Sequence, residues 1–107
     1  MTDLEITKLC AEAMGYQVIG QREPSTVLYS HPNSSAVTCF YQPIHDDAQA
    51  MALVKKLRLR VLPQANGHWC VDNGEPTPYA RGAYWLASAE TLARAACECA
   101  SQMQKAK

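Results

Sequence analysis

The sequence lacks the features that most directly assign a small protein to a class. Ten basic and ten acidic residues cancel, so no overall field draws the chain to nucleic acid or to an anionic membrane. Its longest apolar runs are only a few residues, far short of the roughly 20 that a membrane-spanning helix needs. The first residues carry two acids and lack the charged start and apolar run of a signal peptide. We therefore expect a cytoplasmic protein that does not contact the membrane.

Catalytic signatures are missing as well. The chain has no glycine-rich phosphate loop, and Ser25, Ser34 and Ser35 lie in turn sequences without a Gly-x-Ser-x-Gly elbow. The cysteines are odd in number and follow no disulfide spacing, so we expect free thiols at Cys10, Cys39, Cys70, Cys97 and Cys99. We expect no cofactor, and a catalytic role is less favoured than a binding role.

What is present fits one ordinary globular domain. The chain has 107 residues, of which 48% are hydrophobic and 19% are charged. This composition is typical of a folded protein, and the length suits a single hydrophobic core. We expect one domain spanning residues 1–107.

Two of the three predicted helices lie at the ends of the chain. The first begins at a capping box formed by Thr2 and Glu5 and ends at Gly15. The last is expected to be capped by Ser88. The residues predicted to be buried repeat at helical spacing, and they are Ile6, Leu9, Cys10 and Ala13 in the first helix and Leu92, Ala95, Ala96, Cys99 and Met103 in the last.

The middle helix follows a proline that ends a strand at Pro43. It begins at Asp46 or Asp47, with Asp46 as the N-cap and Gln49 at the reciprocal position of a capping box. Both aspartates suit the positive end of a helix dipole. Its buried stripe is Ala50, Leu53, Val54 and Leu57.

Strands are predicted where β-branched and aromatic residues lie between turn sequences, at 16–20, 26–30, 36–42, 58–62, 68–72 and 79–86. Short turns within the strand groups require antiparallel pairing. The predicted class is therefore α+β. We expect a mainly antiparallel sheet of about five strands with three helices layered against it, in the manner of an α/β/α sandwich.

The stretch 41–51, YQPIHDDAQAM, resembles the phage ABA sandwich domain family. Members carry an aromatic residue, Asn-Pro, two residues, Asp-Asp, and then a helix that starts with Gly-Asp-Ala. The matching positions here are Tyr41, Pro43, Asp46, Asp47 and Ala50, whereas Gln42, Ala48 and Gln49 depart from the commonest residues. The resemblance implies a sheet with helices layered against it and an origin in a phage or prophage. It implies no particular activity.

The first candidate site is His45-Asp46-Asp47. Carboxylates beside a histidine suit a divalent cation or a cationic group, although three adjacent residues cannot all reach one ion. Helix capping alone accounts for the two aspartates, and this interpretation is favoured.

One weaker metal site involves cysteine, and a second cysteine pair is excluded by helix geometry. His68, Cys70 and Asp72 alternate along a strand and so share a face, which allows two or three zinc ligands. A strand with a polar outer face is the favoured alternative. Cys97 and Cys99 lie two apart on a helix and point about 200° away from each other, so they do not form a chelating pair. We expect Cys99 to be buried and Cys97 to be exposed.

The basic residues Lys55, Lys56, Arg58 and Arg60 fall within six positions, which suggests a nucleic-acid contact. The zero net charge and the absence of interleaved aromatic residues favour a solvated helix end instead.

Taken together, the residues predict a non-enzymatic phage or prophage accessory protein of the bacterial host cytoplasm, which acts through protein contacts. Its partner is a host or phage protein or a second copy of the chain in a homodimer. A metal-binding module or metal-dependent enzyme at His45-Asp46-Asp47, and a nucleic-acid-binding factor using residues 55–60, are the alternatives.

Overall fold

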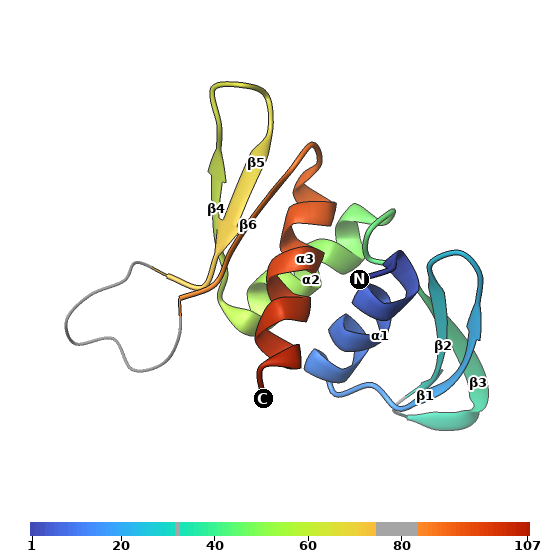
Figure 1. Ribbon diagram of the computed structural model, residues 1–107. Helices are drawn as coiled ribbons and strands as arrows, with labels where there is room; N and C mark the ends of the chain where they lie inside the picture. The colour runs from blue at the N-terminus through green and yellow to red at the C-terminus, as the bar shows by residue number, and fades with distance from the viewer. Residues whose placement is uncertain (32, 75–83) are drawn as a thin grey trace.

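The computed structural model describes residues 1–31, 33–74 and 84–107 (Figure 1). In chain order its elements are α1 (Asp3–Ala13), β1 (Val18–Arg22), β2 (Thr26–His31), β3 (Ser34–Tyr41), α2 (Asp47–Leu57), β4 (Arg60–Pro63), β5 (Trp69–Asp72), β6 (Leu86–Ala89) and α3 (Leu92–Lys105). The strands pair antiparallel in two separate sheets, in the orders β1-β2-β3 and β4-β5-β6. The α+β class is confirmed, but the single sheet of about five strands is wrong.

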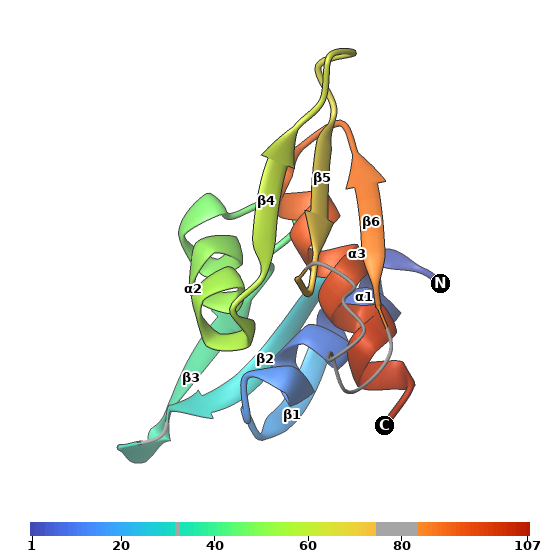
Figure 2. The ribbon, with the colours of Figure 1, turned by 90° about the vertical axis from the view of Figure 1, so that its left-hand side faces the viewer.

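The helices lie between the two sheets (Figures 1 and 2). α1 packs against β1 and β2, α3 packs against β5 and β6, and α3 also contacts both other helices. The expected layering, with helices against one continuous sheet, is therefore replaced by a helical layer that each sheet covers from one side. Each sheet needs only one apolar partner for its inner face, and the helices supply one on each side.

The central helix α3 is buried on two opposite sides. Cys97 and Ala100 belong to the core beside the first sheet, whereas Ala95, Ala96 and Cys99 belong to the core beside the second. The predicted orientation of the two cysteines, on opposite sides of the helix, is therefore right. The predicted exposure of Cys97 is wrong, because α1 covers the side that a helix on one sheet would leave open.

Local capping signals set two of the three helix starts as expected. The Thr2 hydroxyl accepts a hydrogen bond from the Glu5 amide at 3.2 Å, which fixes the start of α1. The last helix is capped by Thr91, whose hydroxyl accepts from the Arg94 amide at 3.2 Å. Ser88, the predicted cap, instead lies in β6 opposite Cys70, because β6 begins and ends later than the predicted strand. Of that predicted strand, residues 79–83 lie outside the described residues.

The first sheet turns one side of each strand toward the helices. Val27 and Tyr41 pair across β2 and β3 and are both buried, and Tyr29 pairs with Cys39 on the same side. Tyr16 stacks on Tyr29 with ring centroids 4.1 Å apart, which closes this side. Alternation then sends the intervening side chains of β2 and β3 outward.

No helix within the described residues is long and apolar enough to cross a membrane.

Candidate functional site

The acidic doublet in the middle of the chain caps α2. The Asp46 carboxylate accepts a hydrogen bond from the Gln49 amide at 3.1 Å, as predicted for an N-cap. His45 and Asp47 are exposed beside it. Across the described residues, no group of three or more His, Cys, Asp or Glu side chains is arranged to hold a metal ion. The structure therefore assigns Asp46 a capping bond and does not gather the three residues around one point.

Gln49 has a role that the sequence did not indicate. Its side-chain nitrogen donates to the Phe40 carbonyl at 3.0 Å, and its side-chain oxygen accepts from the Gln42 amide at 2.8 Å. The predicted capping box would have directed this side chain to the N-cap amide of its own helix. Instead the Gln49 carboxamide forms one donor and one acceptor hydrogen bond with the backbone at the end of β3. A residue of a neighbouring strand would form the same two bonds.

These two bonds show which backbone groups of β3 point away from β2. The Phe40 carbonyl and the Gln42 amide face outward, since both bond to Gln49. Residues in an antiparallel strand alternate between facing the partner strand and facing away from it. The ladder between β2 and β3 is regular from Thr38 to Tyr41, so Thr38 also directs its N–H and C=O outward. We call the stretch Val37, Thr38 and Cys39 the open edge.

The open edge differs from the other three sheet edges. β1 carries Arg22 and a register irregularity after Val18, β4 carries Arg60 and ends at Pro63, and β6 has only four residues. Short length, charge, proline and irregular register all discourage pairing with a further strand. β3 has eight residues and contains neither charge nor proline, although its register with β2 is irregular between Ser34 and Thr38. In the described part of the chain, β2 is its only neighbouring strand.

Apolar groups surround the open edge. The side chain of Phe40, in the regular part of β3, is 51% exposed, and that of Val37, where the register with β2 becomes irregular, is 48% exposed. The Arg22 guanidinium lies 5.3 Å from the centroid of the Phe40 ring, a cation–π contact on the outer side of the sheet. Arg22, Phe40, Thr26 and Gln42 line a shallow depression of about 290 Å³ there. This surface combines unpaired backbone with exposed apolar side chains.

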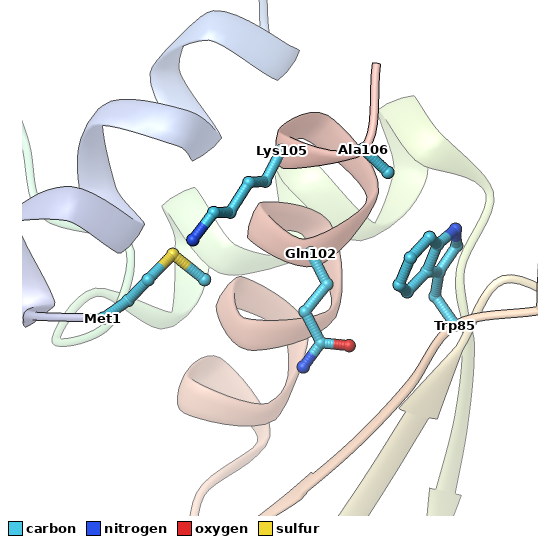
Figure 3. A pocket seen from close by; sticks show the side chains of 5 residues that line it. All are labelled: Met1, Trp85, Gln102, Lys105 and Ala106. Atoms are coloured by element: carbon cyan, nitrogen blue, oxygen red, sulfur yellow. The ribbon is translucent and has the colours of Figure 1, made fainter.

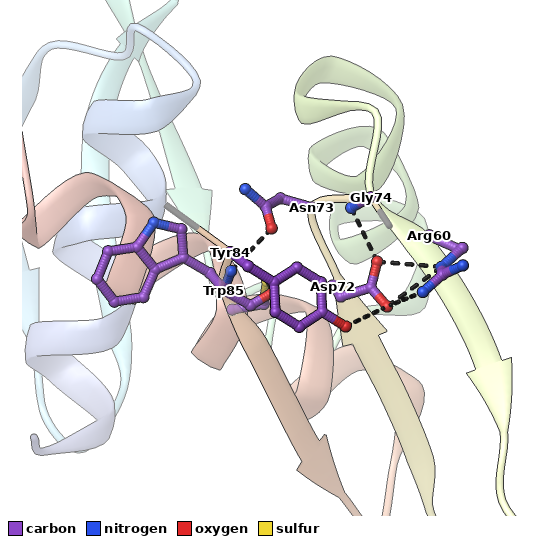
Figure 4. Close-up of polar contacts among 7 residues, drawn as sticks. Arg60, Asp72, Asn73, Gly74, Tyr84 and Trp85 are labelled. Atoms are coloured by element: carbon purple, nitrogen blue, oxygen red, sulfur yellow. Dashed lines mark hydrogen bonds and ion pairs between the residues drawn. The ribbon is translucent and has the colours of Figure 1, made fainter. Parts of the chain in front are cut away.

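The outer side of the second sheet is organised around a buried carboxylate (Figure 4). Asp72 is 1% exposed and accepts hydrogen bonds from Arg60 Nη2 at 2.8 Å, from the Gly74 amide at 2.8 Å and from the Tyr84 hydroxyl at 3.1 Å. Arg60 Nε adds a further contact at 3.1 Å. Burial alone would raise the pKa of Asp72, but the bonds from Arg60, the Gly74 amide and Tyr84 outweigh it and lower the pKa.

This arrangement changes the interpretation of the predicted zinc ligands. The Asp72 carboxylate forms an ion pair with Arg60. From the sequence alone, Arg60 is a candidate nucleic-acid contact. Cys70 is buried on the same strand, and the backbone amide of His68 donates to the Asn66 side chain at 3.0 Å. Pairing of β4 with β5 brings Arg60 opposite Asp72, and that pairing is not visible in the local sequence pattern.

The four basic residues at and after the end of α2 separate into two groups. Lys55 and Lys56 are exposed in the last turn of the helix, where they complement its dipole. Arg58 follows in the left-handed conformation with φ of 54°. Arg60 turns to the second sheet and bonds Asp72. Three cations therefore remain together at the helix end, and the fourth is held in the ion pair.

A groove lies at the carboxyl end of α3, between that helix and the segment before β6 (Figure 3). It has a volume of about 330 Å³ and is lined by Met1, Trp85, Gln102, Lys105 and Ala106. This volume is at the small end of the range for ligand pockets, and its walls are mainly apolar. The Cys99 thiol contacts the Trp85 carbonyl at 3.7 Å, so the groove is continuous with the packing of the second sheet.

Comparison with protein-family models, with curated proteins and with solved structures finds no match to this chain. The resemblance to phage ABA sandwich domains therefore stays a prediction from residues 41–51.

Proposed function

We propose that this chain is a phage or prophage accessory protein that acts by binding another polypeptide along the open edge of β3, and not by catalysis. The observation that carries the proposal is the long uncharged edge strand, whose Thr38 backbone faces away from β2. Exposed N–H and C=O groups of a strand provide main-chain affinity for an added strand. Val37 and Phe40 beside them provide apolar contacts.

The chemistry of the candidate sites supports a binding role. Two of the three carboxylates in the candidate sites, Asp46 and Asp72, hold structural hydrogen bonds. The phage origin, and with it the cytoplasm of a bacterial host, rests on the Pro43-x-x-Asp46-Asp47 helix start.

Nucleic-acid binding is the second candidate function, because Lys55, Lys56 and Arg58 stand together and exposed at the end of α2. Three phosphate contacts give weak, strongly salt-dependent binding. A complex with duplex DNA that forms at low salt, and that a Lys55→Glu and Lys56→Glu double variant loses, would favour this candidate over the first.

A photo-crosslinking amino acid at position 37, in protein expressed in bacterial cells, tests the main proposal. The matched control carries the same group at Leu62, which is 42% exposed on edge strand β4 of the other sheet. We expect a crosslinked polypeptide, of any identity, from position 37 and none from position 62. Adding Thr38→Pro should remove it, because proline blocks strand addition. The proposal fails if both positions give the same products, or if position 37 gives none.

A further inference from the structure

Arg22 differs from the other arginines that lie in the described helices and strands. Arg60 binds the Asp72 carboxylate at 2.8 Å, and Arg94 binds that of Asp3 at 2.9 Å. Arg22 forms no ion pair with any described residue. A guanidinium presents its five N–H donors in a planar fork that matches a carboxylate. These donors of Arg22 are therefore available to a carboxylate of another molecule.

The Arg22 side chain is held in place by an aromatic ring. Its guanidinium lies 5.3 Å from the centroid of the Phe40 ring, which is on β3, across β2 from its own strand. This contact restricts a long side chain, so less conformational entropy is lost when the guanidinium binds a ligand. Phe40 is fixed in turn through its carbonyl, which accepts from Gln49 Nε2 at 3.0 Å. The cation is therefore preorganised on the outer side of the first sheet.

A second donor lines the same depression. Gln42 Oε1 accepts a hydrogen bond from the Thr26 hydroxyl at 3.1 Å, and this bond orients the carboxamide. The Gln42 Nε2 group has no hydrogen-bond partner among the described residues. Both side chains line the depression of about 290 Å³ together with Arg22 and Phe40. A guanidinium and an amide N–H that meet at one depression provide donors for an anionic oxygen.

The charge at the depression favours one kind of anion. Arg22 is the only Lys, Arg, Asp or Glu residue in β1, β2 and β3. Glu23 follows it in the turn but forms no ion pair with it within the described chain. A phosphate group carries roughly −1.5 to −2 charges at neutral pH and is bound by clusters of arginine. A single cation therefore matches a carboxylate better than a phosphate.

Apolar surface continues from the depression along the sheet. Phe40 is 51% exposed and pairs with Leu28 on β2, which pairs in turn with Gly20 on β1. A β-carbon at position 20 would lie 3.2 Å from Leu28 Cδ1, so glycine leaves room for the leucine side chain. The helices lie on the opposite side of this sheet (Figure 1). A ligand with its carboxylate at Arg22 would place nearby apolar groups on Phe40 and Leu28.

We infer that the depression lined by Arg22, Thr26, Phe40 and Gln42 binds the carboxylate of an acidic residue in a partner polypeptide, with an apolar side chain of the partner against Phe40. The inference goes beyond the proposed function, because it concerns the outer side of the first sheet and not the edge of β3. The shallow form of the depression favours a polypeptide over a free organic acid, since a small molecule needs a pocket that encloses it. One exposed ion pair contributes little by itself, so the neighbouring apolar contacts are part of the site.

The experiment follows the isotope-labelled protein by NMR during titration with the capped peptide Leu-Ser-Glu-Ser-Leu. In an extended peptide both leucines lie on the same side as the glutamate. We expect saturable shifts at the Arg22 Nε–H and at the backbone amides of Phe40 and Gln42. The matched peptide with glutamine in place of glutamate should bind at least about fivefold more weakly, because hydrogen bonds to a charged group are stronger. A third peptide with phosphoserine in that position should also bind more weakly than the glutamate peptide.

Variants of the protein separate the guanidinium from other positive charges. Arg22→Gln should bind the glutamate peptide only as weakly as the parent binds the glutamine peptide. Arg22→Lys keeps the charge without the planar fork and should restore part of the affinity. Lys107→Gln removes one positive charge at the end of the chain and should bind as the parent does. Positions 22 and 107 are both exposed, and circular dichroism verifies that each variant is folded.

Four results would overturn the inference: no saturable binding up to roughly 10 mM glutamate peptide, equal affinity for the glutamate and glutamine peptides, equal effects of Arg22→Gln and Lys107→Gln, or tighter binding of the phosphoserine peptide. Each of them leaves the cellular crosslink from position 37, and with it the proposed function, standing. Loss of that crosslink with retention of glutamate-dependent binding at Arg22 would do the reverse.

Discussion

The two sheets have the same number of strands and the same antiparallel order, yet their outer sides are built differently. The second sheet centres on Asp72, a buried carboxylate with donors from Arg60, Gly74 and Tyr84. Among the described side chains of the first sheet no carboxylate is buried in this way, and Phe40 is exposed beside the open edge. The comparison indicates that the second sheet holds its strands together with polar contacts of its own. The first has an exposed phenylalanine and outward backbone at Thr38 instead.

The largest expected effect comes from removing the centre of the second sheet. Asp72→Ala leaves the Arg60, Gly74 and Tyr84 donors without their acceptor at a fully enclosed position. We expect a loss of about 2–4 kcal/mol in the free energy of unfolding, measured by urea denaturation. Asp47→Ala, at an exposed position, is the control and should cost no more than about 1 kcal/mol. Equal losses would show that Asp72 does not stabilise the second sheet through its enclosed hydrogen bonds.

Acid should weaken the second sheet through the same residue. The pKa of Asp72 is lower in the folded protein than in the unfolded chain, where an aspartate titrates near about 3.9. The stabilisation is therefore fully present above that value and is lost as the pH falls through the folded-state pKa. We expect the difference in unfolding free energy between the parent and Asp72→Asn to be largest near neutral pH and to shrink below about pH 4. A difference that does not change with pH would contradict the assignment.

The smallest effect is expected at the first sheet. Gln49→Ala removes two hydrogen bonds at an accessible site and should cost about 1 kcal/mol. It also frees the Phe40 carbonyl and the Gln42 amide, so amide exchange at Gln42 should accelerate. Gln21→Ala, at an exposed position on β1, is the control for loss of a glutamine side chain. Unchanged exchange at Gln42 would mean that Gln49 does not hold this strand end.

The sequence predicted two of the three helix caps, the hairpins and the phase of the last helix, because these depend on residues close together in the chain. Thr2 and Asp46 cap their helices because a hydroxyl or carboxylate at that position reaches an amide three residues later. The hairpins followed from turn sequences between short β-branched runs. The helix phase that separates Cys97 from Cys99 followed from geometry alone.

The division into two sheets and the burial of Cys97 and Asp72 depend on contacts between residues far apart in the chain. Nothing in a strand's own sequence says which of several strands it will join, so the division into two sheets could not be seen. The burial of Cys97 depends on α1 covering the second side of α3, and that of Asp72 depends on Arg60 from the neighbouring strand. The local pattern placed Gln49 in a capping box; its actual partners are backbone groups at the end of β3, which any residue supplies, so the sequence carries no signal for them.

Since α3 supplies packing surface to both cores, its place after every strand has a consequence for synthesis. A ribosome releases α1 before the first sheet that it covers, whereas β5 and β6 emerge before α3, the helix that packs against them. Only when residues 92–105 leave the exit tunnel can the inner side of the second sheet be covered, and the same helix then adds Cys97 and Ala100 to the core beside the first.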